Sequence, residues 1–319
     1  MSKEPRSVDL FGEFYAEPVT RVRLYADEIK PYTNGLGEKW MYIGILAIPD
    51  DRWEKAISWL LEDRQESRYY DEVHFVKLRN YSYAHVHNAK TLLAKRWVRR
   101  VVWDADKMFH FYLLGLNLSN LQARAFGDGS DRERNIYNRF FRSSVFYVLK
   151  SFFGPTNVQV TGIFHDVSDL RNDSLFDWHT IWRLGTHETG LDFRTDKIYF
   201  INSDHHQETE YPEHSHFIQL CDTLTGGFTH CLDARNKKDG CREVASDLLP
   251  LAERLNDTKQ ANNHNSRYQY VRRMAISYFP SKRLTLAQIE EDFQRVQSGF
   301  YKGRRLLLAD QLTGQSCLF

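Results

Sequence analysis

The sequence predicts an α/β fold in which a mixed β-sheet carries helices on both faces. An alternating apolar and polar run at residues 21–27 is followed, after a turn-like segment, by a dense apolar run at residues 40–49, which is the pattern of a β-hairpin. Beyond this hairpin, short strand patterns alternate with longer helical patterns, as in a sheet covered by helices. The chain of 319 residues, 42% of them hydrophobic, is long enough to bury a substantial core.

The elements that follow the hairpin are predicted from hydrophobic spacing. Helical spacing indicates helices at residues 52–66, 83–103, 132–153 and 217–232, with a helical or irregular stretch around residues 178–184. Strand patterns occupy residues 72–78, 109–118, 158–166 and 197–203. The remainder of the chain reads as mostly helical, and residues 256–266 have the composition of a mobile loop.

Composition excludes several classes of protein. The net charge of +1 gives no general attraction to nucleic acid or membrane, so any basic surface has to be local. The four cysteines form no CxxC pair and are expected to be reduced thiols. The amino-terminal residues lack the apolar core of a signal peptide, and no apolar run approaches the ~20 residues of a membrane span. We therefore expect a cytoplasmic protein without membrane contact.

Acidic residues stand at the ends of two predicted strands and inside one apolar helix. Asp27 and Glu28 end the first strand, Asp166 ends a later one, and Asp222 lies in the segment FIQLCDTLTGG. A carboxylate at a strand end projects into the cleft at the sheet edge, and carboxylate oxygens are the ligands that Mg²⁺ and Mn²⁺ prefer. Glu72, with His74 two residues on, adds a further carboxylate if its strand lies beside the first.

Each of these residues also has a structural interpretation. Asp27 fits a turn at a strand end, and Asp222 fits the polar stripe of its helix. Glu72 and His74 fit a surface ion pair and a hydrogen-bonded histidine. Strand alternation places Glu28 on the face opposite Asp27, so Glu28 is a supporting group unless the strand kinks.

The order of these motifs resembles domain-of-unknown-function family thirty-eight hundred, which belongs to the ribonuclease H-like superfamily. YADE, which ends in Asp27 and Glu28, matches the family's opening Asp-Glu-Ser-Gly strand, and Glu72 with His74 matches its Glu-x-His element. Asp166 matches its central strand aspartate, and Ser203 followed by the QLCD segment at residues 219–222 matches its late Ser-Lys and Gln-Leu-Ala-Asp motifs. The chain departs from the family at Ile29 and Lys30 and at Asp204, where Ser-Gly and Lys are usual.

The resemblance implies a metal-dependent nuclease with a ribonuclease H-like sheet. Residues 21–235 would form the catalytic core, residues 1–20 an amino-terminal extension, and residues 236–319 a helical portion packed on that core. Two Mg²⁺ or Mn²⁺ ions would be held by Asp27, Glu72, Asp166 and Asp222, with Glu28, His74 and Ser203 as supporting residues. The substrate would be DNA or RNA, which the sequence does not distinguish, and a role in defence against phage or plasmids is conceivable.

Two further groups of residues, one basic and one rich in histidine, have more than one functional interpretation. Lys95, Arg96, Arg99 and Arg100 form a basic helix face, for which nucleic-acid contact and a merely solvated surface are the two interpretations. Lys302, Arg304 and Arg305 form a second basic cluster with the same two interpretations. The histidines at positions 205, 206, 214 and 216 are irregularly spaced and favour a solvated or substrate-contacting loop over a zinc site. The rival functions are a catalytically silent nucleic-acid- or protein-binding module, and a subunit whose activity needs a partner protein.

Overall fold

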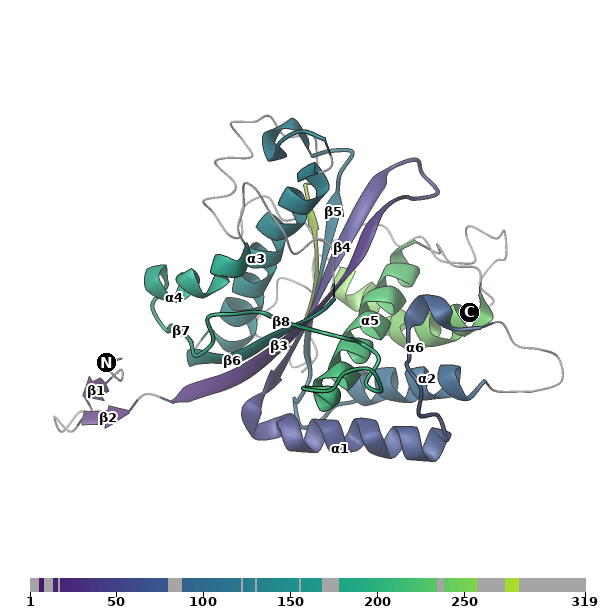
Figure 1. Ribbon diagram of the computed structural model, residues 1–319, viewed down its shortest axis with the longest axis horizontal. Coiled ribbons are helices and arrows are strands. Elements are labelled where there is room, and N and C mark those ends of the chain that lie inside the picture. Colours follow the sequence, from purple (N-terminus) through teal and green to yellow (C-terminus); the bar gives the residue numbers. More distant parts are fainter. Residues whose placement is uncertain are drawn as a thin grey trace.

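A computed structural model describes residues 6–8, 14–16, 18–79, 88–121, 123–129, 131–154, 156–167, 178–233, 238–256 and 273–280. Within these residues a seven-stranded mixed sheet separates two helical layers (Figure 1), so the predicted α/β class is confirmed. A separate two-stranded sheet pairs β1 (Arg6–Val8) with β2 (Phe14–Ala16) near the amino terminus.

The predicted hairpin forms the centre of the sheet. β3 (Val19–Thr33) pairs antiparallel with β4 (Lys39–Pro49), which pairs antiparallel with β5 (His110–Asn117). β6 (Asn157–Asp166) lies parallel to β3 on its other side. β4 and β5 are apolar along almost their whole length because helices cover both of their faces.

Three short strands complete the sheet. β7 (Leu191–Phe193) and β8 (Tyr199–Ile201) both pair parallel with β6, and β9 (Met274–Phe279) pairs parallel with β5. The last strand lies in the carboxy-terminal portion of the chain, where the sequence indicated no strand. The apolar run MAISYF of β9 is buried at all six positions, and its pairing with β5 satisfies the backbone there, so local helical preference does not decide its structure.

The helices divide between the two faces of the sheet (Figure 1). One face is covered by α1 (Asp50–Ser67), α2 (Ala89–Val102), α5 (Pro212–Leu232) and α6 (Asp239–Asn256). The other carries α3 (Asp131–Phe153), with α4 (Leu184–His187) and the 3₁₀ turn η4 (Trp178–Arg183) beside it. Two further 3₁₀ turns are η1 (Phe75–Lys77) and η2 (Ala123–Phe126). The predicted start of the second helix at residue 83 lies outside the described residues.

The register between β3 and β6 changes along their length. Val22 pairs with Val160, whereas Arg23 pairs with Gly162, so β6 contains one extra residue, Thr161. Beyond this irregularity the pairing continues as far as Ala26 with His165. β6 therefore ends beside Asp27, whereas β3 continues to Thr33 along β4, so the prediction that Asp27 and Glu28 end their strand is wrong.

Helix α5 packs closely on the centre of the sheet. A Cβ atom added at Gly44 of β4 would lie 1.9 Å from the Thr225 hydroxyl oxygen, so this strand position has room for glycine and little else. The thiol of Cys221 contacts the carbonyl oxygen of Tyr25 at 3.6 Å. This close contact brings the polar residues of α5 next to the middle of β3.

The predicted strand at residues 72–78 is wrong. This segment is an extended loop that leads into η1, and its backbone N–H groups bond to α5 side chains instead of a neighbouring strand. Apolar and polar residues alternate in this segment because one side of the loop is buried and the other is not.

Other expectations concern residues outside the described part of the chain. These are Cys317, the loop at residues 257–266, and the basic cluster of Lys302, Arg304 and Arg305. The other three cysteines are buried and free, as expected. Among the helices of the described residues, none combines the length and apolarity that a membrane crossing requires.

Candidate functional site

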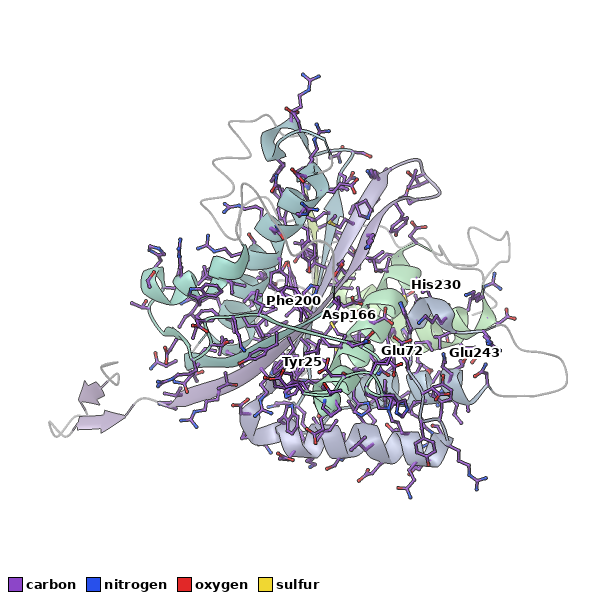
Figure 2. All side chains as sticks on the ribbon, in the orientation of Figure 1. Tyr25, Glu72, Asp166, Phe200, His230 and Glu243 are labelled. Atoms are coloured by element: carbon purple, nitrogen blue, oxygen red, sulfur yellow. The ribbon has the colours of Figure 1, made fainter. Side chains whose placement is uncertain are left out.

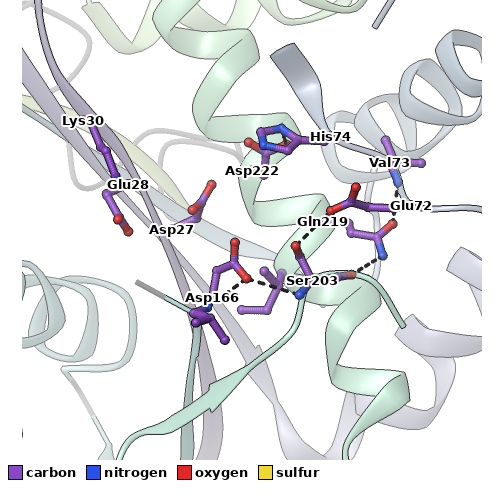
Figure 3. A pocket seen from close by; sticks show the side chains of 12 residues that line it. Asp27, Glu28, Lys30, Glu72, Val73, His74, Asp166, Ser203, Gln219 and Asp222 are labelled. Atoms are coloured by element: carbon purple, nitrogen blue, oxygen red, sulfur yellow. Dashed lines mark hydrogen bonds and ion pairs between the residues drawn. The ribbon is translucent and has the colours of Figure 1, made fainter. Parts of the chain in front are cut away.

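The four acids predicted as metal ligands line one cavity. Asp27, Glu72, Asp166 and Asp222 reach it from β3, the loop before η1, β6 and α5, and the cavity volume is about 180 Å³ (Figure 3). Glu28, His74 and Ser203, the three supporting residues predicted from sequence, line it as well. The fold thus brings together every carboxylate that the sequence singled out.

Asp27 and Asp166 occupy matching positions on the two parallel strands. Because Ala26 pairs with His165, the next residue of each strand is an aspartate. Tyr25 and Phe164, two residues earlier, stack on the α5 side of the sheet, so strand alternation directs both aspartates to that side. Figure 3 shows the two carboxylates facing the cavity.

Glu28 lies on the opposite side of β3 from Asp27, as alternation predicts (Figure 3). Its Oε2 atom is 3.5 Å from Nε2 of His165, and the hydroxyl of Tyr137 bonds to the same ring nitrogen. Nδ1 of His165 lies 2.7 Å from the carbonyl oxygen of Asp166; because a carbonyl only accepts, Nδ1 is the donor. Glu28 and His165 therefore form a buried network on the opposite face of the sheet, which supports the middle of β3 and the end of β6.

Asp222 faces the cavity. The alternative prediction, in which Asp222 belongs to the polar, solvent-facing stripe of its helix, is therefore wrong. Its Oδ2 atom accepts a hydrogen bond of 2.6 Å from the backbone N–H of Phe75 and lies 3.1 Å from Nδ1 of His74. Burial opposes protonation of His74, but the hydrogen bond and negative charge of Asp222 outweigh it and raise the pKa of His74. Asp222 thus anchors the loop that carries Glu72.

Ser203 connects Glu72 with Asp166. Its hydroxyl donates to Oε1 of Glu72 at 3.0 Å, and its backbone N–H donates to Oδ1 of Asp166 at 3.2 Å. The other oxygen of Glu72 accepts from Lys77 at 2.6 Å. Glu72 therefore lines the cavity and also makes the surface ion pair that the structural interpretation of this residue anticipated.

Two residues that organise the site were not singled out as functional from the sequence. Gln219 donates to the carbonyl oxygen of Ser203 at 2.6 Å and accepts from the backbone N–H of Val73 at 2.9 Å. Arg64, 2% exposed on α1, donates to the same Gln219 oxygen at 2.6 Å and to the carbonyl oxygen of Asp71 at 2.9 Å. Gln219 stands inside the QLCD segment, whereas Arg64 has no local signal beyond a charge at a core-facing helix position.

The acids repel one another in the folded protein. The pKa of Asp27 is raised well above its usual value, chiefly by burial and then by the negative charges of Asp222, Glu28 and Asp166. Burial likewise raises the pKa of Asp166, although the nearby His165 partly offsets it. Among the described residues, no lysine or arginine forms an ion pair with Asp27. A bound cation would relieve this repulsion.

The four acids are chemically suited to bind a hard divalent cation, because each of them offers carboxylate oxygens as ligands. As the side chains stand, no group of three or more His, Cys, Asp or Glu within the described ranges is arranged to hold a metal ion. Lys77, Ser203 and His74 currently bond to carboxylates that metal binding requires. Any cation therefore has to compete with these partners.

The ion pair between His74 and Asp222 makes stability depend on pH. The folded-state pKa of His74 is raised above the value of the unfolded chain, so its stabilisation is complete below about pH 6.5 and is lost as the pH rises through the folded pKa. We expect His74→Gln to destabilise the protein more at pH 6 than at pH 9, measured by urea unfolding. The same substitution in an Asp222→Asn background should lose this pH dependence, and an equal cost at both pH values would contradict the pairing.

The basic face of α2 is compensated by acids of neighbouring helices. Arg99 makes two bonds of 3.0 and 3.1 Å to Asp247 of α6, and Arg100 makes two of 2.8 and 3.0 Å to Asp63 of α1. Lys95 and Arg96 pair with Glu243 and Glu66, respectively. These pairs neutralise the charge on which the predicted nucleic-acid contact depended, so this face plays no part in our proposal.

The histidine group is not a single solvated loop. His214 and His216 lie on α5; burial lowers the pKa of His214 to about 4, and the ring of His214 stacks on Phe164. His216 accepts a hydrogen bond from Arg64 at 3.1 Å, and the positive charge of Arg64 adds to burial in lowering the pKa of His216. Only His205 and His206 belong to the connecting loop, beside the cavity wall.

Comparison of the chain with protein-family models, with curated proteins and with solved structures finds no match.

Proposed function

We propose that the protein is a metal-dependent nuclease that hydrolyses phosphodiester bonds of DNA or RNA with Mg²⁺ or Mn²⁺. The convergence of Asp27, Glu72, Asp166 and Asp222 on one cavity carries this proposal. These acids come from distant parts of the chain, and their mutual repulsion favours a bound cation. Burying several carboxylates together without a counter-charge is costly, so such a cluster needs a functional reason.

The strand order also supports a ribonuclease H-like interpretation of the fold. The first three long strands of the sheet are antiparallel neighbours, and the fourth lies parallel to the first. Asp166 ends β6 beside Asp27 of β3, and the carboxyl end of a parallel strand is where open α/β sheets commonly bind ligands. The motif resemblance leads to the same superfamily through different observations.

Each residue has a definite part in the proposed site. Asp27 and Asp166 would hold a cation from the sheet, Asp222 would hold it from α5, and Glu72 would approach from the loop. A bound divalent cation would lower the pKa of a water molecule and stabilise charge on the phosphate. Ser203 orients Glu72 and Asp166 through its hydroxyl and N–H, and His74 keeps Asp222 directed into the cavity.

A cleavage panel tests the proposal. Labelled single- and double-stranded DNA and RNA are incubated with the native protein and Mg²⁺ or Mn²⁺, beside Asp166→Asn and Asp222→Asn. We expect cleavage of at least one substrate by the native protein and a loss of about a thousandfold in either variant. Asp128→Asn, whose side chain is 99% exposed outside the cavity, is the matched control and should retain full activity.

Two outcomes would count against a nuclease. Cleavage that persists unchanged in both variants would show that a contaminant or another site is responsible. Absence of cleavage together with negligible Mn²⁺ binding would favour the silent binding module. The second rival, a subunit that needs a partner protein, would be indicated by Mn²⁺ binding without cleavage and by a shift to a larger species in gel filtration after cell extract is added.

A further inference from the structure

A second, larger cavity adjoins the acid-lined one. Its volume is about 560 Å³, within the range of small-molecule sites, and both cavities share Glu28, Lys30, His74 and Asp222 as lining residues. Ile29, Phe75 and Val76 supply apolar walls to the second cavity. A ligand that spans both would place an apolar portion beside η1 and a charged portion beside the acids.

Two buried polar side chains line this second cavity. His230, labelled in Figure 2, is 4% exposed and lies near the end of α5. Thr229, the preceding residue of the same helix, is 3% exposed. In the described parts of the chain, neither ring nitrogen of His230 has a hydrogen-bond partner, and the hydroxyl of Thr229 has none either. Buried polar groups are nearly always paired, so three such atoms at one cavity wall indicate a ligand that completes them.

The chemistry of these groups defines the ligand. Burial, with a smaller effect of Arg242, lowers the pKa of His230 to about 4, so its imidazole is neutral at pH 7 and offers one donor and one acceptor. A neutral donor–acceptor pair between apolar walls suits a flat heterocycle with its own donors and acceptors. Lys30 and Lys238 line the cavity together with Glu28, Asp222 and Asp233, so its charges of opposite sign give no net attraction for a phosphate.

We propose that this cavity binds the nucleobase of the nucleotide next to the hydrolysed phosphate, with His230 and Thr229 bonding to the edge of the base. The biological context rests on the proposed nuclease function, whereas the recognition of the base does not need the metal. A base can enter such a cavity only when it is unstacked and unpaired. The substrate class is therefore single-stranded nucleic acid, or a strand with a base turned out of its helix.

Nucleoside binding tests the base cavity separately from the metal site. Adenosine, guanosine, cytidine, uridine and thymidine are titrated into the full-length protein in EDTA and followed by calorimetry and ligand-observed NMR. We expect at least one nucleoside to bind, and His230→Phe to weaken it about tenfold, because phenylalanine keeps the ring but removes both nitrogens. Thr229→Val should weaken binding by a smaller factor.

A second variant blocks the cavity without changing a core residue. Val76 is 48% exposed at its wall, so Val76→Trp should fold normally and obstruct binding. Leu61→Trp, at a 44% exposed position of α1 outside the cavity, is the matched control and should bind as the native protein does. Circular dichroism and thermal unfolding confirm that each variant is folded.

The outcomes separate the base cavity from the nuclease proposal. Nucleoside binding that weakens in His230→Phe and Val76→Trp, and persists in Asp27→Asn, supports the base cavity whether or not the protein cleaves nucleic acid. No binding of any nucleoside at millimolar concentration overturns the inference. Equal binding in the native protein and in Val76→Trp overturns it as well, because the nucleoside would then occupy another place.

Discussion

Replacing Asp27 with asparagine should make the metal-free protein more stable at pH 7 while it removes divalent-cation binding. Asp27 has a raised folded-state pKa, so the folded protein retains a proton there over a pH range in which the unfolded chain has lost it. Stability from this group is therefore lost as the pH rises from about 4 through the folded pKa. Asparagine has no charge to bury, and it should raise the free energy of unfolding by about 1–3 kcal/mol at pH 7.

Addition of Mn²⁺ should make the native protein more stable than Asp27→Asn. The native protein should gain stability from the cation according to its concentration and dissociation constant, because the ion binds only the folded state. Asp27→Asn should gain little, with a dissociation constant at least about tenfold weaker. Cleavage should fall about a thousandfold if the nuclease proposal holds.

Urea unfolding with EDTA and with Mn²⁺ measures both effects without any assay of activity. Asp128→Asn is again the control and should follow the native protein in both buffers. If Asp27→Asn is less stable than the native protein in EDTA, or gains as much from Mn²⁺, the acid cluster is not a cation site.

Arg64→Met should destabilise the protein by about 3 kcal/mol or more, the largest loss that we expect from a residue outside the cavity. The guanidinium is buried, lies 4.9 Å from the ring centre of Trp97, and donates to Gln219, His216 and the backbone of the loop before η1. Methionine keeps most of the volume but leaves these acceptors unpaired, which costs free energy for each one.

The same substitution should weaken cation binding indirectly. Arg64 and Gln219 hold the loop that carries Glu72 against the loop that carries Ser203. Without Arg64, we expect Mn²⁺ affinity to fall by about tenfold although no proposed ligand changes. Arg52→Met, at an exposed position of the same helix, should alter unfolding by less than about 0.5 kcal/mol and leave Mn²⁺ affinity unchanged. Equal effects of the two substitutions would contradict this role for Arg64.

Strand alternation was sufficient to predict that Asp27 and Glu28 point to opposite faces of the sheet. The positions of Asp27 and Glu28 follow from the two-residue period of a strand, and so do those of His165 and Asp166. That information is local, and the hydrophobic pattern of each strand carries it.

The alternating pattern gave a wrong prediction where long-range contacts determine the backbone conformation. The segment around Glu72 has the pattern of a strand, yet its N–H groups bond to Gln219 and Asp222, which lie 146 and 147 residues further along the chain. Nothing local to Glu72 indicates these partners. The buried position of Arg64 escaped detection for the same reason, because only the packed structure supplies the acceptors that make burial of a guanidinium tolerable.

The extra residue in β6 decides which side chain enters the cavity. Val160 and Ile163 contribute to the same core although they are three positions apart, which an unbroken strand does not permit. If Thr161 paired with Arg23 instead of being skipped, the register before the irregularity would continue, and His165 would stand beside Asp27 while Asp166 turned toward α3. Whether an imidazole or a second carboxylate stands beside Asp27 is thus set by the one residue of β6 that the pairing with β3 leaves out.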